Sequence, residues 1–451
     1  MSSDSRLFDM NECSNDESNI CLTLLDGYDK LIQTGGQSVE RTILHCDLNS
    51  FFASVELLEH PDLADHPVAV CGDPESRHGI VLAKNEAAKK FGIQTAETVW
   101  QARQKCPDLV MLPPHHQKYR AYSKKVNAIY GQYTDLVEPF SIDESWLDVT
   151  GTLPLFHKDG KALADELRER LKRELGLSIS AGVSFNKVFA KLGSDYKKPD
   201  ATTVISRDNF QAIVWPLPVT DLLFVGRTAA QLLKRYGVRT IGDLARFDPE
   251  TLTLLLGQQG SKLSAYARGE DNAPVVPAGQ LPPPKSVGNG MTFRRNLNSP
   301  AEVRTGIELL SDTVAARLRR ETLLAGGIQV TIRDPEFRTI TRQKPLELST
   351  DLSRELSAAA YELVCRHWSF QRPIRMLTVT AQNLLTPEEA AHQGNLFASG
   401  EDQKRKKLQR LEQTVDQIRN RYGKSAIQLA ALTEDRSAGT EVPDHISFKD
   451  H

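Results

Sequence analysis

The sequence predicts a multidomain α+β protein, and three observations support this fold class. The chain has 451 residues, enough for about three domains of ordinary size. Apolar residues make up 40% of it and charged residues 25%, as in globular proteins, and no run of about 18 apolar residues predicts a membrane span. Strand-like apolar runs are mixed with amphipathic helical patterns, without an internal repeat.

The first 40 residues are predicted to be a disordered acidic leader. They are rich in Ser, Asn and Asp, show little periodicity and carry a net charge of −6. They lack the basic segment followed by an apolar stretch that marks a secretion signal. The six cysteines form no C-x-x-C pair, so we expect reduced, buried thiols and a cytoplasmic location.

Residues 41–215 are expected to form the first and largest domain. An apolar strand at 42–46 meets Asp47 and is followed by a helical pattern that includes Phe51 and Phe52. The segment 137–148 is predicted to be a hairpin. Further strands are expected at 67–71, 80–82 and 178–183, and helices at 119–133, at 161–174 and in a Lys/Ala-rich segment ending near Gly92.

Two proline-rich segments divide the rest of the chain. Trp215–Pro218 predicts a boundary before 216–280, where glycines break two short helical pairs. A stiff linker at 281–287 then precedes an α+β domain at 288–385, in which two helices are expected to cover a four-stranded sheet. The last segment, 386–451, is polar and contains one amphipathic helix at 403–420.

The net charge of −2 hides an uneven distribution. Residues 41–150 carry −4, whereas residues 151–284 carry +4 and residues 285–384 carry +5. Basic stretches of this kind are typical of a polyanion-binding protein, although a solvated surface explains them equally well.

Three carboxylates are the candidate catalytic residues. Asp47 ends the first strand, and the adjacent Asp143 and Glu144 lie at the turn of the predicted hairpin. Neighbouring acids flanked by apolar residues are costly to bury unless a cation neutralises them, and oxygen-only ligands favour Mg²⁺. Two such ions, about 4 Å apart, stabilise the attacking and leaving oxygens of a displacement at phosphorus. The alternative is structural, with an ordinary turn at Asp143 and a helix cap at Asp47.

Three motifs place these acids in a wider context, namely His45–Glu56 (HCDLNSFFASVE), Phe140–Asp148 (FSIDESWLD) and Ala181–Pro199. Together they resemble the Y-family (translesion) DNA polymerases, and they are most similar to the bacterial DNA polymerase IV (DinB) group. The resemblance covers about residues 42–430.

The resemblance implies an architecture for each predicted domain. A palm with a mixed or antiparallel sheet would occupy 41–215, with fingers inserted at about 66–118. An all-α thumb with a helix-hairpin-helix would occupy 216–280, and an α+β little finger 288–385. A bacterial, cytoplasmic monomer is expected, associated with the nucleoid when it is on DNA.

The resemblance also implies a reaction. A template-directed, low-fidelity polymerase without proofreading would add dNTPs to a primer 3′ end by nucleotidyl transfer. Asp47, Asp143 and Glu144 would hold two Mg²⁺ ions, with the backbone carbonyl of Leu48 assisting. The rival hypothesis is a non-catalytic scaffold that binds DNA and a sliding clamp, but the presence of all three acids favours the enzyme. A generic Mg²⁺ phosphotransferase would leave the later domains unexplained.

The resemblance assigns nucleotide contacts as well. Phe52 matches the aromatic residue that lies under the sugar and excludes a 2′-hydroxyl, whereas Phe51 is equally well explained as a core residue at helical spacing. Lys198 matches a lysine that contacts the triphosphate.

The fingers depart from the common pattern. Relatives usually place a Tyr and an Arg on the triphosphate, but this chain has Glu86 and Lys89 at those positions. An acid would repel a triphosphate, so Glu86 is expected to turn away. Lys84 or Lys89 is then expected to supply the missing contact, although a lysine lacks the bidentate fork of arginine.

Contacts with DNA are expected from two domains. A helix start at Gly226 resembles the helix-hairpin-helix, which presents backbone N–H groups to phosphates without reading sequence. In the little finger, alternating strand residues would place several arginines on one DNA-facing side. The candidates are Arg294, Arg295, Arg333, Arg338 and Arg342, for each of which a solvated position is an equal alternative.

A clamp-binding peptide is predicted in the polar tail. Gln393, Leu396 and Phe397 match the Gln-x-x-Leu-Phe form of a sliding-clamp (beta clamp) motif. An exposed Leu-Phe pair is costly unless a partner groove binds it.

Overall fold

The computed structural model describes residues 40–73, 79–280, 282–392, 402–423 and 426–427. The described residues divide into two compact units, one made of those before residue 50 together with 125–277, the other of those in 50–124 together with those from 278 onward. Of the predicted acidic leader, only Glu40 is among the described residues. Within the described ranges, no helix combines the length and the apolar character needed to span a membrane.

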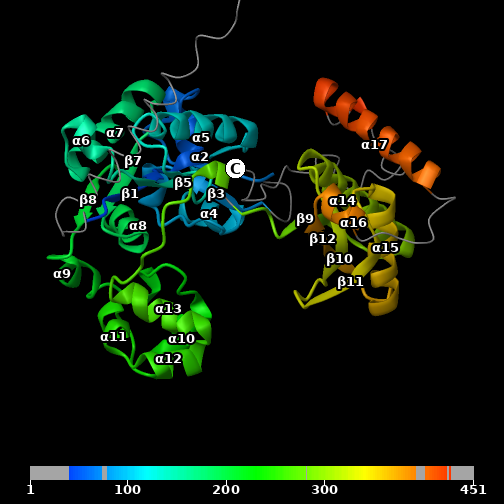
Figure 1. Ribbon diagram of the computed structural model, residues 1–451. Helices are drawn as coiled ribbons and strands as arrows, with labels where there is room; N and C mark the ends of the chain where they lie inside the picture. The colour runs from blue at the N-terminus through cyan, green and yellow to red at the C-terminus, as the bar shows by residue number, and fades with distance from the viewer. Residues whose placement is uncertain (1–39, 74–78, 281, 393–401, 424–425, 428–451) are drawn as a thin grey trace, which may run out of the picture. The chain divides into compact units, whose positions relative to one another are not determined.

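The first unit is built on a mixed five-stranded sheet (Figure 1). The strands are β1 (Ile43–Leu48), β5 (Val137–Pro139), β6 (Glu144–Asp148), β7 (Ile179–Ser184) and β8 (Thr202–Ile205), in the order β5-β6-β1-β7-β8. β1 runs antiparallel to both β6 and β7, and β8 runs parallel to β7. Every residue of β1 and β7 is buried, because these central strands are covered on both faces. The predicted hairpin at 137–148 is confirmed by the pairing of β5 with β6.

Two helices of this unit pack on the sheet. The buried leucines of α7 (Gly160–Leu175) lie against β7, and α7 begins with an Asp159 cap and ends at Gly176 with φ 69°. α8 (Lys187–Tyr196) packs on β1 and β7. Its approach requires a glycine in β7, because a Cβ on Gly182 would lie 1.8 Å from the carbonyl oxygen of Ala190. α6 (Leu153–Phe156) and α9 (Phe210–Val214) are further helices of this unit, and α5 (His116–Tyr130) has residues in both units.

The four helices predicted from the glycine-broken segment form a small bundle (green in Figure 1). They are α10 (Arg227–Arg235), α11 (Ile241–Arg246), α12 (Pro249–Leu256) and α13 (Gln258–Ala267). Their core contains Leu233, Leu244, Leu252 and Leu263, all fully buried.

In the second unit, residues 50–124 form a small sheet with short helices. The strands lie in the order β3-β2-β4. The elements are α2 (Phe51–Leu57), β2 (Val68–Cys71), β3 (Val81–Lys84), α3 (Glu86–Lys89), α4 (Val99–Lys105) and β4 (Val110–Leu112). The sequence did not indicate α4 or β4, because seven and three residues are too short to show a period.

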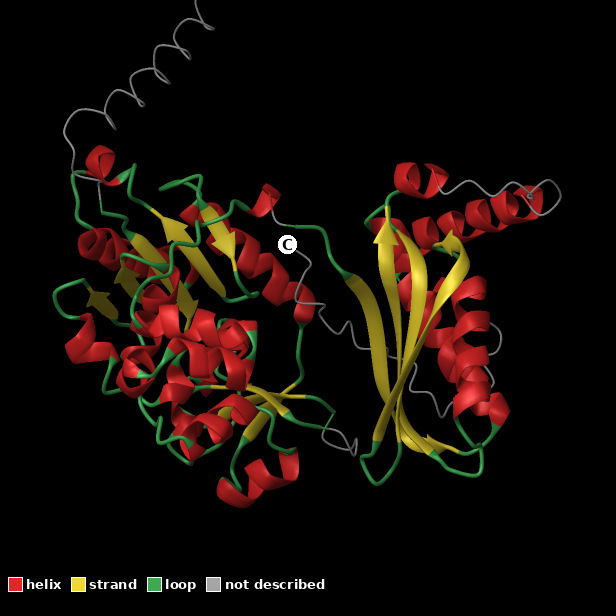
Figure 2. Ribbon diagram, turned by 60° about the horizontal axis from the view of Figure 1, so that its bottom comes forward, coloured by secondary structure: helices red, strands yellow, loops and turns green. Residues whose placement is uncertain are grey.

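Residues 286–385 form the predicted four-stranded sheet with two helices. The strands are β9 (Ser286–Leu297), β10 (Leu324–Arg333), β11 (Thr339–Thr350) and β12 (Ile374–Leu385), in the order β11-β10-β12-β9. β9 begins inside the segment predicted to be a linker. α14 (Pro300–Arg320) and α15 (Ser353–His367) cover one face of the sheet (Figure 2), and α14 starts at a capping box formed by Ser299 and Glu302.

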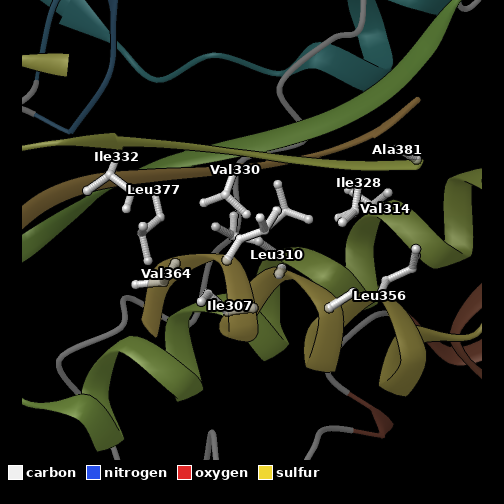
Figure 3. Close-up of a cluster of buried hydrophobic side chains, with 14 of the residues drawn as sticks. Ile307, Leu310, Val314, Ile328, Val330, Ile332, Leu356, Val364, Leu377 and Ala381 are labelled. Carbon is white, nitrogen blue, oxygen red and sulfur yellow. The ribbon is translucent and has the colours of Figure 1, made fainter. Parts of the chain in front are cut away.

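The core between these helices and this sheet is continuous. Ile307, Leu310 and Val314 of α14 face Ile328 and Val330 of β10 (Figure 3), and all five are at most 1% exposed. Two further helices follow β12, α16 (Pro387–His392) and α17 (Asp402–Tyr422).

Four cysteines lie in the described residues, and all are free thiols. Cys46, Cys71 and Cys106 are buried as expected, but Cys365 is exposed, so the prediction of buried thiols is wrong there.

Candidate active site

The three predicted carboxylates come together at one end of the β1–β6 ladder. The antiparallel register places Asp47 directly opposite Glu144, so their side chains lie on the same face of the sheet. The backbone N–H of Leu48 donates to the carbonyl of Asp143 at 3.0 Å, which fixes the third acid beside them. The helix cap alternative for Asp47 is wrong, because the N-cap residue of α2 is Ser50.

Two lysines neutralise two of these acids. Lys198 Nζ lies 2.7 Å from Asp47 Oδ2, and Lys191 Nζ lies 2.6 Å from Glu144 Oε2. Lys198 also contacts Asp195 Oδ1 at 2.8 Å. Because Asp47 is only 6% exposed, the lysine compensates a charge that water does not reach easily.

The three carboxyl groups have different pKa values because their partners differ. Burial raises the pKa of Asp47, and the Lys198 ammonium opposes this rise. Burial also raises the pKa of Asp143, whose Oδ1 accepts a hydrogen bond from Ser141 Oγ at 2.6 Å. Burial acts on Glu144 in the same direction, but His45 and Lys191 hold the pKa of Glu144 well below its usual range. A bound cation would therefore offset the free-energy cost of ionising Asp47 and Asp143 in this site.

Several residues of the site were not identified as functional from the sequence. His45 is fully buried, and desolvation lowers its pKa. Its Nε2 lies 3.5 Å from Glu144 Oε2, and its Nδ1 lies 2.8 Å from Ser194 Oγ. The hydroxyl of Ser194 in turn donates to the Lys191 carbonyl at 2.8 Å. The contact between His45 and Ser194 exists only because α8 packs on β1, which no local pattern predicts.

Asn49 connects the end of β1 with two neighbouring segments. Its amide donates to Ser180 Oγ at 2.9 Å, and its Oδ1 accepts from the backbone N–H of Asp200 at 2.9 Å. The same oxygen accepts from Ser178 Oγ at 3.2 Å. Asn49 therefore holds in place the loop that carries Lys198.

The donor set fits Mg²⁺ bound together with a substrate. No three His, Cys, Asp or Glu side chains of the described ranges form a ready-made metal cage. Mg²⁺ does not require one, since it usually takes one or two carboxylates and completes its shell with water and substrate phosphates. Asp47, Asp143 and Glu144 offer oxygen ligands only, and two of them have pKa values raised by burial.

In the second unit, Phe52 and Phe51 occupy different environments. Phe51 is 3% exposed and lies in the interior, whereas Phe52 is half-buried. The ring of Phe52 stacks on Tyr119 at a centroid distance of 4.1 Å and an angle of 11°. Tyr119 is fully buried, and its hydroxyl donates to the buried carboxylate of Glu56. Tyr119 and Glu56 thus set the position of the Phe52 ring.

The predicted nucleotide lysines of this unit form one small cluster. Lys89 Nζ lies 2.5 Å from Glu86 Oε1, which also accepts from Ser50 Oγ at 3.2 Å. Lys84 Nζ donates to Thr95 Oγ1 at 2.8 Å, and burial together with the charge of Lys89 lowers the pKa of Lys84. Glu86 is therefore directed at Lys89 and Ser50.

The helical bundle presents an uncapped helix start. Gly226 is the N-cap of α10, and no side chain of the described residues caps this helix. A Cβ on Gly226 would meet no atom within 4 Å, so the backbone there is openly accessible. This geometry suits contact between backbone N–H groups and a phosphate.

The arginines predicted on strands do not share one face. Arg333 lies on the face of β10 opposite the buried Val330, and Arg294 alternates in the same way with the buried Phe293. These two arginines therefore lie on the open face of the sheet. Arg295 is on the helix side, where it pairs with Glu302.

Two further arginines of the predicted set also lie away from the open face. Arg342 is registered opposite Val330, so it also lies on the helix side. Arg338 precedes β11 in the turn and pairs with Asp334 and Glu336, and it is not on a strand.

The open face of this sheet is rich in hydroxyl and amide groups, which were not among the functional residues predicted from the sequence. Thr331 is registered opposite Thr341 and Thr378, and Gln329 opposite Thr380. These residues alternate with the buried core positions of the same strands, which is the period-2 signal that could have identified them.

The predicted clamp motif, Gln393, Leu396 and Phe397, lies outside the described residues.

Comparisons with known proteins agree with the geometry. Residues 46–195 match the impB/mucB/samB family, and residues 284–396 match the impB/mucB/samB family C-terminal domain. A DNA polymerase IV of Acetivibrio thermocellus is 46% identical over 398 residues, which is 88% of this chain and 99% of that protein. DNA polymerase IV 1 of Bacillus subtilis is 37% identical over 401 residues, 89% of this chain and 95% of that protein.

A solved structure shows the same fold. A Y-family DNA polymerase chimera (Dbh-Dpo4-Dbh) superposes with a TM-score of 0.69 and covers 76% of this chain and 99% of its own, at 21% sequence identity.

Proposed function

Because this chain belongs to the Y-family DNA polymerases of the DNA polymerase IV type, and is therefore a translesion DNA-directed DNA polymerase, we propose that Asp47, Asp143 and Glu144 are its catalytic carboxylates. The observation that carries this assignment is the register of β1 and β6, which places Asp47 opposite Glu144. The domains would be the palm and fingers at 41–215, the thumb at 216–280 and the little finger at 288–385.

Metal dependence is general in this family, and we propose two Mg²⁺ ions held by the three carboxylates, with the Leu48 carbonyl assisting. Bound metal would lower the pKa of the primer 3′-hydroxyl and neutralise charge on the triphosphate. The protein supplies the fixed oxygens for this, because Asp47 and Asp143 are held in one geometry by the sheet and by the Leu48 N–H bond to Asp143.

We propose that Lys198 is a movable triphosphate contact. In the structure its ammonium pairs with Asp47 and Asp195, and these two carboxylates raise its pKa against the effect of burial. The lysine is therefore charged at neutral pH. A bound triphosphate offers it another anionic partner, so Lys198 can exchange Asp47 for phosphate while Asn49 holds its loop.

In the fingers, Lys84 and Lys89 are the proposed substitutes for the usual Tyr and Arg. Glu86 neutralises Lys89, which keeps an unpaired acid away from an incoming triphosphate. Lys84 donates only to a neutral hydroxyl, that of Thr95. Exchanging this hydrogen bond for one to a phosphate oxygen costs less free energy than breaking the ion pair between Lys89 and Glu86.

For DNA, we propose the backbone at Gly226 and the open sheet face with Arg294 and Arg333 as contacts. The hydroxyls of Thr331 and Thr378 can donate to phosphate oxygens on that face, a mode of binding that does not read sequence. Arg295 and Arg338 already pair with acids in the protein.

The sliding clamp is the proposed protein partner, through Gln393, Leu396 and Phe397, and the polymerase is proposed to act as a monomer. We also propose a cytoplasmic location in a bacterium, a proposal supported by the bacterial DNA polymerase IV proteins among the relatives.

Primer extension tests the catalytic assignment. The wild-type protein with Mg²⁺ should extend a primer, and Asp143→Ala should reduce kcat by at least about 10³-fold, since a fixed oxygen near the reacting phosphate is lost. A DNA-binding measurement on the same variant should be unchanged, which separates lost chemistry from lost folding. Extension by Asp143→Ala at the wild-type rate would contradict the assignment, and the absence of any wild-type extension would favour the scaffold hypothesis.

A further inference from the structure

The C-terminal helix α17 is attached to the little finger by buried ion pairs. The side chain of Arg319 on α14 is 7% exposed, and its Nε lies 2.6 Å from Asp416 Oδ2 of α17. Arg319 also pairs with Glu412. The carboxylate of Glu412 accepts the backbone N–H of Ser353 at 3.1 Å, at the start of α15, where the N-cap residue Leu352 offers no side-chain acceptor. α17 thus caps α15.

Two more contacts fix the rotation of α17 about its axis. Near its start, Arg405 donates to the Ser349 carbonyl at 2.6 Å and pairs with Glu355 at 3.1 Å. Near its end, Arg419 Nη1 lies 2.8 Å from Asp312 Oδ2 of α14. Because the helix is anchored at both ends and at its centre, one defined side of it faces the solvent.

The described charged side chains on that outer side are all basic. At about 100° per residue, Lys407, Arg410 and Arg421 fall on the side opposite the anchoring residues Glu412 and Asp416, and Lys404 and Lys406 lie at the two edges of that side. All of them are exposed, and none forms an ion pair with another described residue. We call this set the basic face of α17, and its members are Lys404, Lys406, Lys407, Arg410 and Arg421.

This arrangement does not follow from the overall charge of the helix. The acids Glu412 and Asp416 both point toward Arg319, so the pairing removes every described acidic side chain of α17 from its outer side. Lysine and arginine heads without acids between them create a local positive potential that attracts a polyanion.

We propose that the basic face of α17 is a second, sequence-independent DNA-binding surface that contacts backbone phosphates. α17 packs on α14 and α15, and these helices cover the sheet face opposite Arg294 and Arg333. DNA on the basic face is therefore a different segment from DNA on the open sheet face. Residues 402–422 also lie beyond the matched family segment, 284–396, so α17 adds to the little finger.

DNA is the favoured ligand of the basic face of α17, because a DNA-binding protein with so little net charge needs a local basic surface. The net charge of −2 supplies no long-range attraction, so a local basic surface is needed to retain a polyanion. A group of exposed, flexible cations suits a phosphate backbone, which needs charge and no shape recognition.

The salt dependence of DNA binding by the full-length protein tests the proposal. The probe is a long duplex without a primer end, and the variant is Lys404→Gln/Lys407→Gln/Arg410→Gln. Each lost phosphate contact should make the slope of log K against log salt less steep by about 0.9, so a change of up to about 3 is expected. The charge-conserving variant Lys404→Arg/Lys407→Arg should keep the wild-type slope.

A matched control removes the same net charge elsewhere. Lys158→Gln/Lys161→Gln/Arg173→Gln changes exposed residues at α7, on the first unit, and should leave the slope unchanged. An unchanged slope in the α17 variant, or an equal change in the control, would overturn the proposal. Unchanged duplex binding with weaker clamp binding would also overturn it, in favour of an acidic protein partner. Extension of a short primer–template is measured alongside, so that loss of polymerase activity is recognised separately.

Discussion

Asp143 shows how function and stability oppose each other at a single residue. It is half-buried beside Glu144, it accepts a hydrogen bond from the Ser141 hydroxyl, and burial raises its pKa. An acid whose pKa is higher in the folded state destabilises the fold when it is ionised, that is, at pH values above that pKa.

Asp143→Asn is therefore expected to stabilise the protein while it removes activity. At pH 8 the free energy of unfolding should increase by about 1 kcal/mol, because a neutral amide replaces a partly buried charge. The gain should shrink as the pH falls through the raised pKa of Asp143, where the wild-type carboxyl becomes protonated. Urea unfolding at several pH values measures this, and a gain that is independent of pH would contradict the explanation.

Phe52 is the residue on which sugar selection is expected to depend. Its ring is held by Tyr119 and remains half-exposed, whereas Phe51 is in the interior. Phe52→Ala should therefore raise the efficiency of ribonucleotide incorporation relative to dNTPs by at least about tenfold, since a steric barrier to the 2′-hydroxyl is lost.

The control for this prediction is Phe51→Leu. It replaces the buried phenylalanine next to Phe52 by another apolar side chain, and it should affect stability without changing the sugar preference. The ratio of kcat/KM for the two nucleotide types is the measurement. An unchanged ratio in Phe52→Ala would show that another residue excludes the 2′-hydroxyl.

At the scale of elements, the packing of α8 on the sheet determines the geometry of the site. α8 carries Lys191 to Glu144, and the loop after α8 carries Lys198 to Asp47. α8 can lie this close to β7 only because residue 182 is a glycine, since a Cβ at Gly182 would overlap the Ala190 carbonyl.

Gly182→Ala should consequently destabilise the protein by about 3 kcal/mol or more and lower activity, since the obstacle is backbone and cannot rotate away. Gly131→Ala is the matched control, because its Cβ would meet only ordinary contacts at 3.5 Å or more. The control should change stability by no more than about 0.5 kcal/mol. Thermal unfolding compares the two variants, and equal effects would contradict the packing argument.

At the scale of the whole molecule, the charge distribution predicts weak retention on DNA. Acids gather in residues 1–150 and bases in residues 151–384, so DNA is expected to be held by local contacts. A partner that encircles DNA would then raise the effective concentration of the polymerase at the primer end.

With the clamp present, Leu396→Ala/Phe397→Ala should accordingly reduce the number of nucleotides added before the polymerase dissociates from the primer. Without the clamp, the same variant should add as many nucleotides as the wild type. Single-turnover primer extension with a trap for released enzyme measures both cases. A loss of equal size without the clamp would assign these residues to the polymerase itself.

Much of this protein could be derived from its sequence. Strands such as 42–46 and helices such as 161–174 were predicted because their apolar residues recur with the period of one face, and the carboxylates because each stands in a local motif. The family followed from the same motifs.

Only the tertiary structure decided how those residues act on one another. The register of β1 with β6 places Asp47 opposite Glu144, the packing of α8 brings Lys191 to Glu144 and Ser194 to His45, and the pleat of β10 and β11 separates Arg333 from Arg342. Such contacts join residues that are far apart in the chain, and the local periodicity of a sequence contains no information on which elements pack together.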